Sequence, residues 1–208
     1  MYKKQDMVVI RSAGASKRLE ALTDGIIAIV ATLLVLEIRV PKLPESYSRH
    51  QMMHAIAGML PSLVAFIFSF LNILVFWLNH DSVAKLLYYF DRKLTFLNFF
   101  FLLFISLVPF TTAYVSEYPL DKVAVSAYGI VLFLASVVAA WMYHYIAFNS
   151  NMMHISITLS TRRKIWRKIM VGPIAFLAAI LLGWLHPLIP ILIYILMPIF
   201  FMFMPAMD

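Results

Sequence analysis

The chain contains no cysteine and few charged residues. Across 208 residues, the absence of cysteine excludes disulfides, thiolate metal sites, iron–sulfur clusters and cysteine nucleophiles, and it leaves the redox compartment open. Charged side chains make up 13% of the chain and hydrophobic side chains 63%. A soluble domain of this size cannot bury so much apolar surface, so composition excludes a water-soluble globule. A chain this short has room for about six membrane-spanning helices of roughly 20 residues, and none for a separate soluble catalytic domain.

Six apolar segments lie between charged or proline-marked breaks, and they predict six transmembrane helices in one domain over residues 1–208. Their approximate ranges are 19–40, 55–79, 94–116, 123–148, 169–185 and 187–205. Runs such as residues 99–104 are apolar on every face, as a helix in lipid requires, and the alternating strands of a barrel are absent. The fold class expected is therefore an all-α integral membrane protein.

Lysine and arginine are distributed unevenly between the breaks. Five precede the first segment, three lie between the second and third, and five between the fourth and fifth, which puts 13 of the 17 on one side of the membrane. The other four are Arg39, Lys42, Arg49 and Lys122. The positive-inside rule then predicts cytoplasmic N- and C-termini in a plasma or inner membrane. The net charge of +7 therefore reflects orientation and contact with lipid headgroups, and it does not indicate nucleic acid. The first segment lacks a small-residue cleavage site, which favours a retained helix over a signal peptide.

Polar side chains are dense at the cytoplasmic end of the first segment, where Arg18, Glu20, Thr23 and Asp24 follow one another. Arg18 and Asp24 are six residues apart and so lie on different faces of one helix, which predicts that each pairs with another helix. Gly25 beside them permits close packing. Ordinary interfacial charges that reach to water are the alternative.

Matching polar groups occur at the same depth in the next two segments, namely Trp77, Asn79, His80 and Asn98. A carboxylate at Asp24 held by His80, the Trp77 N–H or Asn98 would fix the first helix against the second and third. A proton relay through Asp24 and His80 is less favoured, because no ionisable group continues the path through the membrane.

Ile29, Leu33 and Leu36 fall on one stripe of the first helix. Such a stripe serves helix packing more often than it lines a pore. A pore would also need an oligomer, since one helix cannot enclose a channel. The pattern alone leaves both interpretations open.

Residues 18–38 resemble the first-helix signature of the transmembrane protein 175 family, the potassium channels of endolysosomes and their prokaryotic relatives. That signature has an arginine followed four residues later by Phe-Ser-Asp, and here Arg18 is followed by Leu22, Thr23 and Asp24. The resemblance continues through residues 77–80, 97–110 and 127–129 and the closing proline-containing helix pair, so it covers nearly all six segments.

The resemblance implies a homotetramer in which the first helix of each subunit lines a central pore. Carried over by position, Ile29 matches the narrowest hydrophobic ring, Leu33 and Leu36 continue the wall, and Thr32 matches a hydroxyl layer linked to selectivity. Arg18, Thr23 and Asp24, with Trp77 and His80, match the motif that ties the pore helix in place. No Thr-Val-Gly-Tyr-Gly loop is present, so we expect a hydrophobic gate and modest selectivity for K⁺ over Na⁺.

Glu37 offers a ring of carboxylates at the outer mouth, or a salt bridge with Arg39 or Lys42. The partners expected are further copies of the chain, membrane lipids and permeant K⁺, with no cofactor. A secondary transporter or proton-coupled carrier is the alternative, but it needs polar groups near the bilayer midplane and repeat symmetry, and neither is evident. An intramembrane enzyme needs clustered catalytic groups, which the pattern also lacks.

Overall fold

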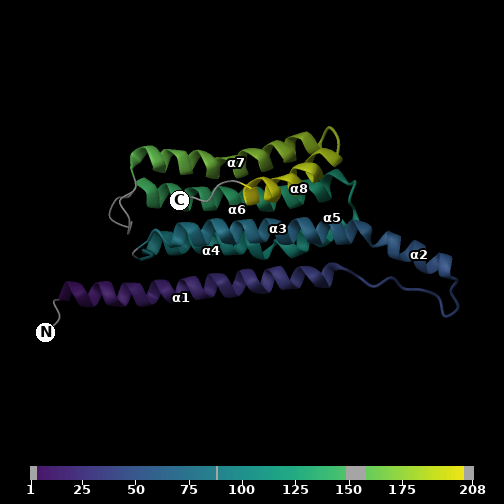
Figure 1. Ribbon diagram of the computed structural model, residues 1–208, viewed down its shortest axis with the longest axis horizontal. Coiled ribbons are helices and arrows are strands. Elements are labelled where there is room, and N and C mark those ends of the chain that lie inside the picture. Colours follow the sequence, from purple (N-terminus) through teal and green to yellow (C-terminus); the bar gives the residue numbers. More distant parts are fainter. Residues whose placement is uncertain (1–3, 88, 149–157, 204–208) are drawn as a thin grey trace.

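The computed structural model describes residues 4–87, 89–148 and 158–203, with side chains from residue 16 onward, and its regular elements are all helical. In chain order they are α1 (Lys4–Leu33), the 3₁₀ helix η1 (Leu34–Glu37), α2 (Arg49–Gly58), α3 (Leu60–Ala84), α4 (Arg92–Ser106), α5 (Val108–Glu117), α6 (Lys122–Phe148), α7 (Leu159–Gly183) and α8 (Leu188–Phe203). Figure 1 shows them as an elongated bundle with α1 along one edge and α7 along the opposite edge.

Five helical segments in the described residues are long and apolar enough to cross a membrane: Ser16–Glu37, Arg49–Ala84, Arg92–Glu117, Lys122–Phe148 and Leu159–Gly183. The last predicted segment forms α8, which has 16 residues, fewer than the roughly 20 that a perpendicular crossing takes. The chain is therefore an all-helical protein with five to six apolar helices.

Several helices extend beyond the apolar segments that the sequence marks. Helix α1 begins at Lys4, well before residue 19, and α7 begins at Leu159, ahead of residue 169. The basic residues 162–168 are consequently helical, where a polar connector was expected. The apolar pattern shows where the chain enters the lipid, not where the helix ends. A helix continues past that point as long as its backbone hydrogen bonds are made.

Proline divides two of the predicted segments into two helices each. Helix α3 starts after Met59 with Pro61 in its first turn, and α5 starts after Leu107 with Pro109 in its first turn. Because proline has no backbone N–H and fits the first turn, it marks a new helix start at each place. The polar residues Ser48, Asp91 and Thr158 cap α2, α4 and α7 through side-chain oxygens.

Helix α6 lies at the centre of the bundle and contacts α4, α5, α7 and α8. Helix α1 packs on one side, against α3, α4 and α5. Of the apolar stretch within Ser16–Glu37 that could cross a membrane, 28% is buried in the bundle, compared with 61% for the apolar stretch of α6. Most of the surface of α1 is therefore free to face something other than its own chain.

A buried polar cluster joins four helices inside the bundle. Thr112 Oγ1 donates to Ser69 Oγ at 2.8 Å, and Ser69 Oγ donates to Tyr128 Oη at 3.1 Å. Asn72 Nδ2 donates to the Tyr194 carbonyl at 2.9 Å. These residues are not among the polar groups that the sequence pattern singled out. These groups bond to one another across α3, α5, α6 and α8, which satisfies them away from water.

Candidate functional site

The predicted stripe lies on the side of α1 and η1 that points away from the bundle, with Ile29 and Leu33 on α1 and Leu36 on η1. Ile29 is 59% exposed, Leu33 43% and Leu36 69%. The opposite face is buried against the rest of the chain, with Ile27 at 3% and Leu34 at 0%. Within the described part of the chain, then, the stripe is not used for packing.

Two further positions share this uncovered side of α1. Leu22, which stands where the related signature has phenylalanine, is 46% exposed. A Cβ atom added to Gly25 would have no neighbour within 4 Å. The expected close packing at Gly25 therefore does not occur with the described residues of the same chain, and the position is open to a neighbouring molecule.

Thr32 lies beside the stripe and is exposed. Its hydroxyl is within hydrogen-bonding distance of two carbonyl oxygens of its own helix, Ile29 O at 2.8 Å and Ala28 O at 3.1 Å. Since carbonyls only accept, the hydroxyl proton is held by the helix backbone. The Thr32 oxygen therefore presents lone pairs, and no proton, to whatever faces α1.

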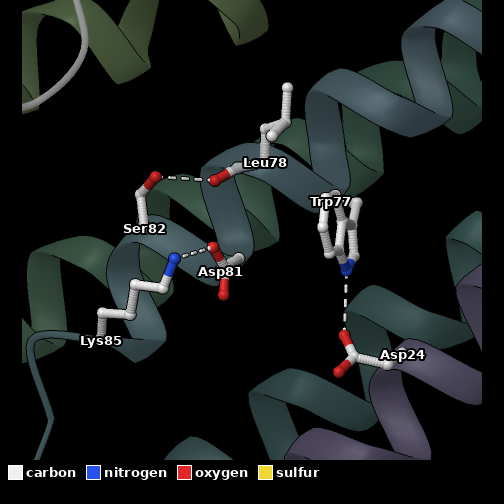
Figure 2. A network of polar contacts seen from close by, with 6 residues as sticks. All are labelled: Asp24, Trp77, Leu78, Asp81, Ser82 and Lys85. Carbon is white, nitrogen blue, oxygen red and sulfur yellow. Dashed lines mark hydrogen bonds and ion pairs between the residues drawn. The ribbon is translucent and has the colours of Figure 1, made fainter.

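Asp24 is held by α3. The indole Nε1 of Trp77 donates to Asp24 Oδ1 at 2.9 Å (Figure 2). Of the three partners considered from the sequence, Trp77 is the one that reaches the carboxylate. The bond joins the exposed side of α1 to a neighbouring helix.

A second set of bonds joins α1 to α4 and α4 to α3. Thr23 Oγ1 donates to the Leu19 carbonyl at 2.9 Å, Asn98 Nδ2 donates to Thr23 Oγ1 at 2.8 Å, and His80 Nε2 lies 2.7 Å from Asn98 Oδ1. Thr23 and Asn98 are buried, and the His80 ring stacks on Phe101 with centroids 5.4 Å apart.

The Leu19 carbonyl determines which group donates in each of these hydrogen bonds. The Leu19 carbonyl can only accept, so Thr23 donates to it and must accept from Asn98. The amide nitrogen of Asn98 then faces Thr23 and its oxygen faces His80, so His80 Nε2 carries a hydrogen and donates. Thr23, His80 and Asn98, which the sequence placed at one depth, form a single chain of donors.

Arg18 does not take part in these contacts. It is exposed and makes no hydrogen bond or ion pair with the described side chains. Glu37 is half-buried at the far end of η1, and neither Arg39 nor Lys42 forms an ion pair with it in the described residues. The expectation of a salt bridge there is not met within the chain.

An open cleft of about 300 Å³ lies next to the Trp77–Asp24 bond, lined by Glu20, Asp24, His80, Asp81 and Lys85 among others. Lys85 Nζ pairs with Asp81 Oδ2 at 2.6 Å, one helical turn away on α3 (Figure 2). Sequence reasoning did not single out Asp81, although its position directly after His80 at the end of an apolar segment was a signal. Two carboxylates, Glu20 and Asp24, form no salt bridge with the described side chains.

Groups of three or more histidine, cysteine, aspartate or glutamate side chains that could hold a metal ion are absent from the described residues. The first helix therefore presents an uncovered apolar face that carries one hydroxyl oxygen, from Thr32. Hydrogen bonds to α3 and α4 hold one end of this helix in place.

Known proteins are similar to the part of the chain that contains these residues. Residues 18–109 match the family model of the endosomal/lysosomal potassium channel TMEM175. A potassium channel of Chamaesiphon minutus is 39% identical over 137 residues, which are 63% of this chain and 66% of that protein. A potassium channel of Streptomyces collinus is 38% identical over 121 residues, 56% of this chain and 57% of that protein. The aligned part thus spans less than two thirds of either relative's length.

The fold extends the likeness to almost the whole chain. The crystal structure of a lysosomal potassium-selective channel TMEM175 homologue from Chamaesiphon minutus superposes with a TM-score of 0.78 at 27% identity. It covers 91% of this chain and 97% of that chain. The resemblance inferred from the first-helix signature is confirmed, and the long apolar helices identify an integral membrane protein. The proteins to which it is similar are channels and not enzymes. In sequence and in fold, the chain is similar to the channels of the TMEM175 family.

Proposed function

We propose that the chain forms a potassium-selective cation channel, a homotetramer with the α1 helix of each subunit lining one central pore. The observation that carries the proposal is the uncovered stripe of Ile29, Leu33 and Leu36 on a helix whose other side is anchored. Similarity to proteins that are named potassium channels supports it.

The assembly follows from the shape of α1. One helix cannot enclose a path, so a pore needs the same face from several copies around a symmetry axis. The uncovered side includes Gly25, where no described atom beyond the backbone of its own helix turns lies within 4 Å of an added Cβ, so a neighbouring helix can approach closely there. Four copies place four such faces around the axis.

The gate is hydrophobic. Side chains at Ile29, Leu33 and Leu36 offer no oxygen to replace an ion's water, so a narrow ring of them is dry and non-conducting. Widening the ring lets water and partly hydrated cations enter. Gating is therefore a change in pore hydration at Ile29.

Selectivity rests on Thr32. With its proton held by the backbone of α1, its oxygen can replace part of a cation's hydration shell. Na⁺ holds its water more strongly than K⁺, so partial replacement favours K⁺ modestly. A carbonyl filter of the Thr-Val-Gly-Tyr-Gly kind is not encoded in the sequence.

Carboxylates at both ends of the stripe supply the preference for cations. Glu20 and Asp24 lie toward one end, and Glu37 lies at the other. Repeated by symmetry, they give each mouth of the pore a negative potential, which raises the local cation concentration. The end that carries Glu20 and Asp24 is the cytoplasmic one, by the excess of lysine and arginine there.

Ion flux in proteoliposomes tests the proposal. Vesicles loaded with K⁺ and diluted into K⁺-free buffer should release K⁺ rapidly and without a coupled ion, and Na⁺-loaded vesicles should release Na⁺ more slowly. Protein-free vesicles with valinomycin give the full K⁺ release, which shows that the vesicles are tight. Flux that saturates and moves a second ion in fixed ratio would instead identify a secondary transporter or a proton-coupled carrier.

A further inference from the structure

The outer surface where α6 ends and α7 begins carries unusual charge. Residues 122–207 contain no aspartate or glutamate, yet Arg162, Arg163, Lys164, Arg167 and Lys168 lie within them. Arg162 Nη1 donates to the Ala147 carbonyl at 2.6 Å and so caps the end of α6. Arg163, Lys164 and Arg167 make no hydrogen bond or ion pair with the described side chains, and all three are exposed. Among the described residues, these three cations therefore have no counter-ion.

An apolar groove begins beside these cations. It has a volume of about 310 Å³ and lies between α6 and α7, lined by Val137, Ala140, Trp141, His144, Trp166, Met170 and Pro173. We call it the α6–α7 groove. The His144 ring lies 4.9 Å from the Trp166 ring and 4.7 Å from the Phe148 ring, so aromatic groups form the wall at the basic end.

Helical spacing puts the cations and the groove in line. Arg163 and Arg167 are four residues apart on α7, on the same face as Trp166 and Met170. From Arg167 to Pro173 the helix rises about 9 Å, at 1.5 Å per residue. The surface therefore passes from guanidinium groups through a tryptophan to an apolar floor, over the distance from a phosphate group to the upper part of an acyl chain.

We propose that this surface binds an anionic phospholipid, with the headgroup phosphate on Arg163, Lys164 and Arg167 and one acyl chain in the α6–α7 groove. Guanidinium groups match phosphate oxygens in paired hydrogen bonds. Tryptophan belongs at the level where headgroups meet acyl chains, and basic pockets between transmembrane helices are suited to anionic headgroups. The site is independent of the channel proposal, because it lies on α6 and α7 and its test measures lipid contact.

Quenching of tryptophan fluorescence by brominated lipid tests the site, because Trp141 and Trp166 line the groove. All proteins carry W184F, which removes an exposed tryptophan at the other end of α7. We expect brominated phosphatidylglycerol to quench more than brominated phosphatidylcholine at equal mole fraction. The excess should be lost in R163Q/K164Q/R167Q and kept in R39Q/K42Q/R49Q, a variant with the same change of charge on three exposed residues away from the groove. Elution of each variant at the parent volume in size-exclusion chromatography shows that it is folded.

Each contrary result overturns the proposal in a recognisable way. Equal quenching by the two lipids, or an excess that survives in R163Q/K164Q/R167Q, means that no anionic lipid is selected there. Loss of the excess on adding glycerol phosphate means that the cations bind the phosphate group alone. Absence of quenching by either lipid means that a second copy of the chain covers the groove. Native mass spectrometry should agree, with fewer phosphatidylglycerol molecules retained by R163Q/K164Q/R167Q than by R39Q/K42Q/R49Q.

Discussion

The indole N–H of Trp77 on α3 donates to the carboxylate of Asp24 on α1, 2.9 Å away. Asp24 lies just before the uncovered stripe that begins at Ile29. This bond and the donor chain through Thr23 hold the same end of α1 at two points. Ser16 adds one more polar contact, since its Oγ accepts from the Phe90 N–H at 2.8 Å. Beyond Asp24, α1 is held by apolar contacts on one side. The position of the stripe relative to the bundle therefore depends on a few polar atoms.

Replacing Trp77 by phenylalanine should loosen α1 with little loss of apolar area. We expect a loss of about 1 kcal/mol in stability, as for one hydrogen bond, together with altered K⁺ flux. Thermal unfolding in detergent and flux in proteoliposomes measure the two effects. The matched control is W184F, because Trp184 is 59% exposed and lies in the turn just after α7, away from α3. Identical behaviour of the two variants would show that the Trp77–Asp24 bond contributes nothing.

Replacing Asn98 by leucine should cost more, because it leaves both His80 Nε2 and Thr23 Oγ1 without their partner. Asn98 is 0% exposed, and each unsatisfied buried group costs about 1–3 kcal/mol. The same substitution at Asn79, whose amide bonds to none of the described side chains, serves as the control. Thermal unfolding should separate N98L from N79L by several degrees, and coincident melting curves would contradict the role of the donor chain.

Replacing Ile29 by asparagine should raise K⁺ flux several-fold, since an amide wets the narrowest ring of the proposed pore. The control is I67N, which changes an isoleucine that is 54% exposed on α3 to the same residue. Bilayer recording or vesicle flux provides the measurement. Unchanged current in I29N would remove Ile29 as the gate, and an equal rise in I67N would point to leakage through the lipid.

Replacing Thr32 by valine should lower the ratio of K⁺ to Na⁺ permeability toward one while current persists, because it deletes the oxygen and keeps the shape. Thr95 supplies the control, since its hydroxyl makes the same kind of bond to a carbonyl of its own helix, Asp91 O at 2.8 Å, on α4. Reversal potentials under bi-ionic conditions measure the ratio. A ratio unaltered in T32V would assign selectivity to other groups.

Replacing Gly129 by alanine should destabilise the bundle, because the new Cβ would clash with Tyr194 Oη and would lie 2.9 Å from Ile180 Cγ1. Tyr194 cannot yield easily, since it is fully buried and its hydroxyl donates to the Val125 carbonyl at 3.1 Å. We expect a loss of about 1–3 kcal/mol, as for overpacking elsewhere. G172A is the control, with an ordinary contact of 3.6 Å to Ser136 Cβ. Equal melting temperatures for G129A and G172A would contradict the tight contact.

The residues that anchor α1 could be placed together from the sequence, because depth in the membrane follows from counting along apolar segments. Asp24, Trp77, His80 and Asn98 fall at one depth by that count. Which partner takes the Asp24 carboxylate depends on the rotation of each helix about its axis, and residue counting does not supply that angle. Only the packed structure distinguishes Trp77 from His80 and Asn98.

Features that leave hydropathy nearly unchanged escaped prediction. Single hydroxyls at Ser69, Thr112 and Tyr128 scarcely alter an apolar average, yet together they form the buried cluster between α3, α5 and α6. The helix over residues 162–168 was not predicted for a different reason. Charged residues there indicate where the lipid ends, but they do not distinguish a helix from a loop.

The donor chain from His80 through Asn98 and Thr23 to the Leu19 carbonyl has one direction, and this determines how the contact responds to acid. A second proton on His80 can enter only at Nδ1, because Nε2 already carries the hydrogen that Asn98 accepts. The imidazolium would keep every hydrogen bond of the neutral ring and strengthen the first of them. Protonation therefore adds charge beside the acidic cleft without releasing the helix that carries Ile29.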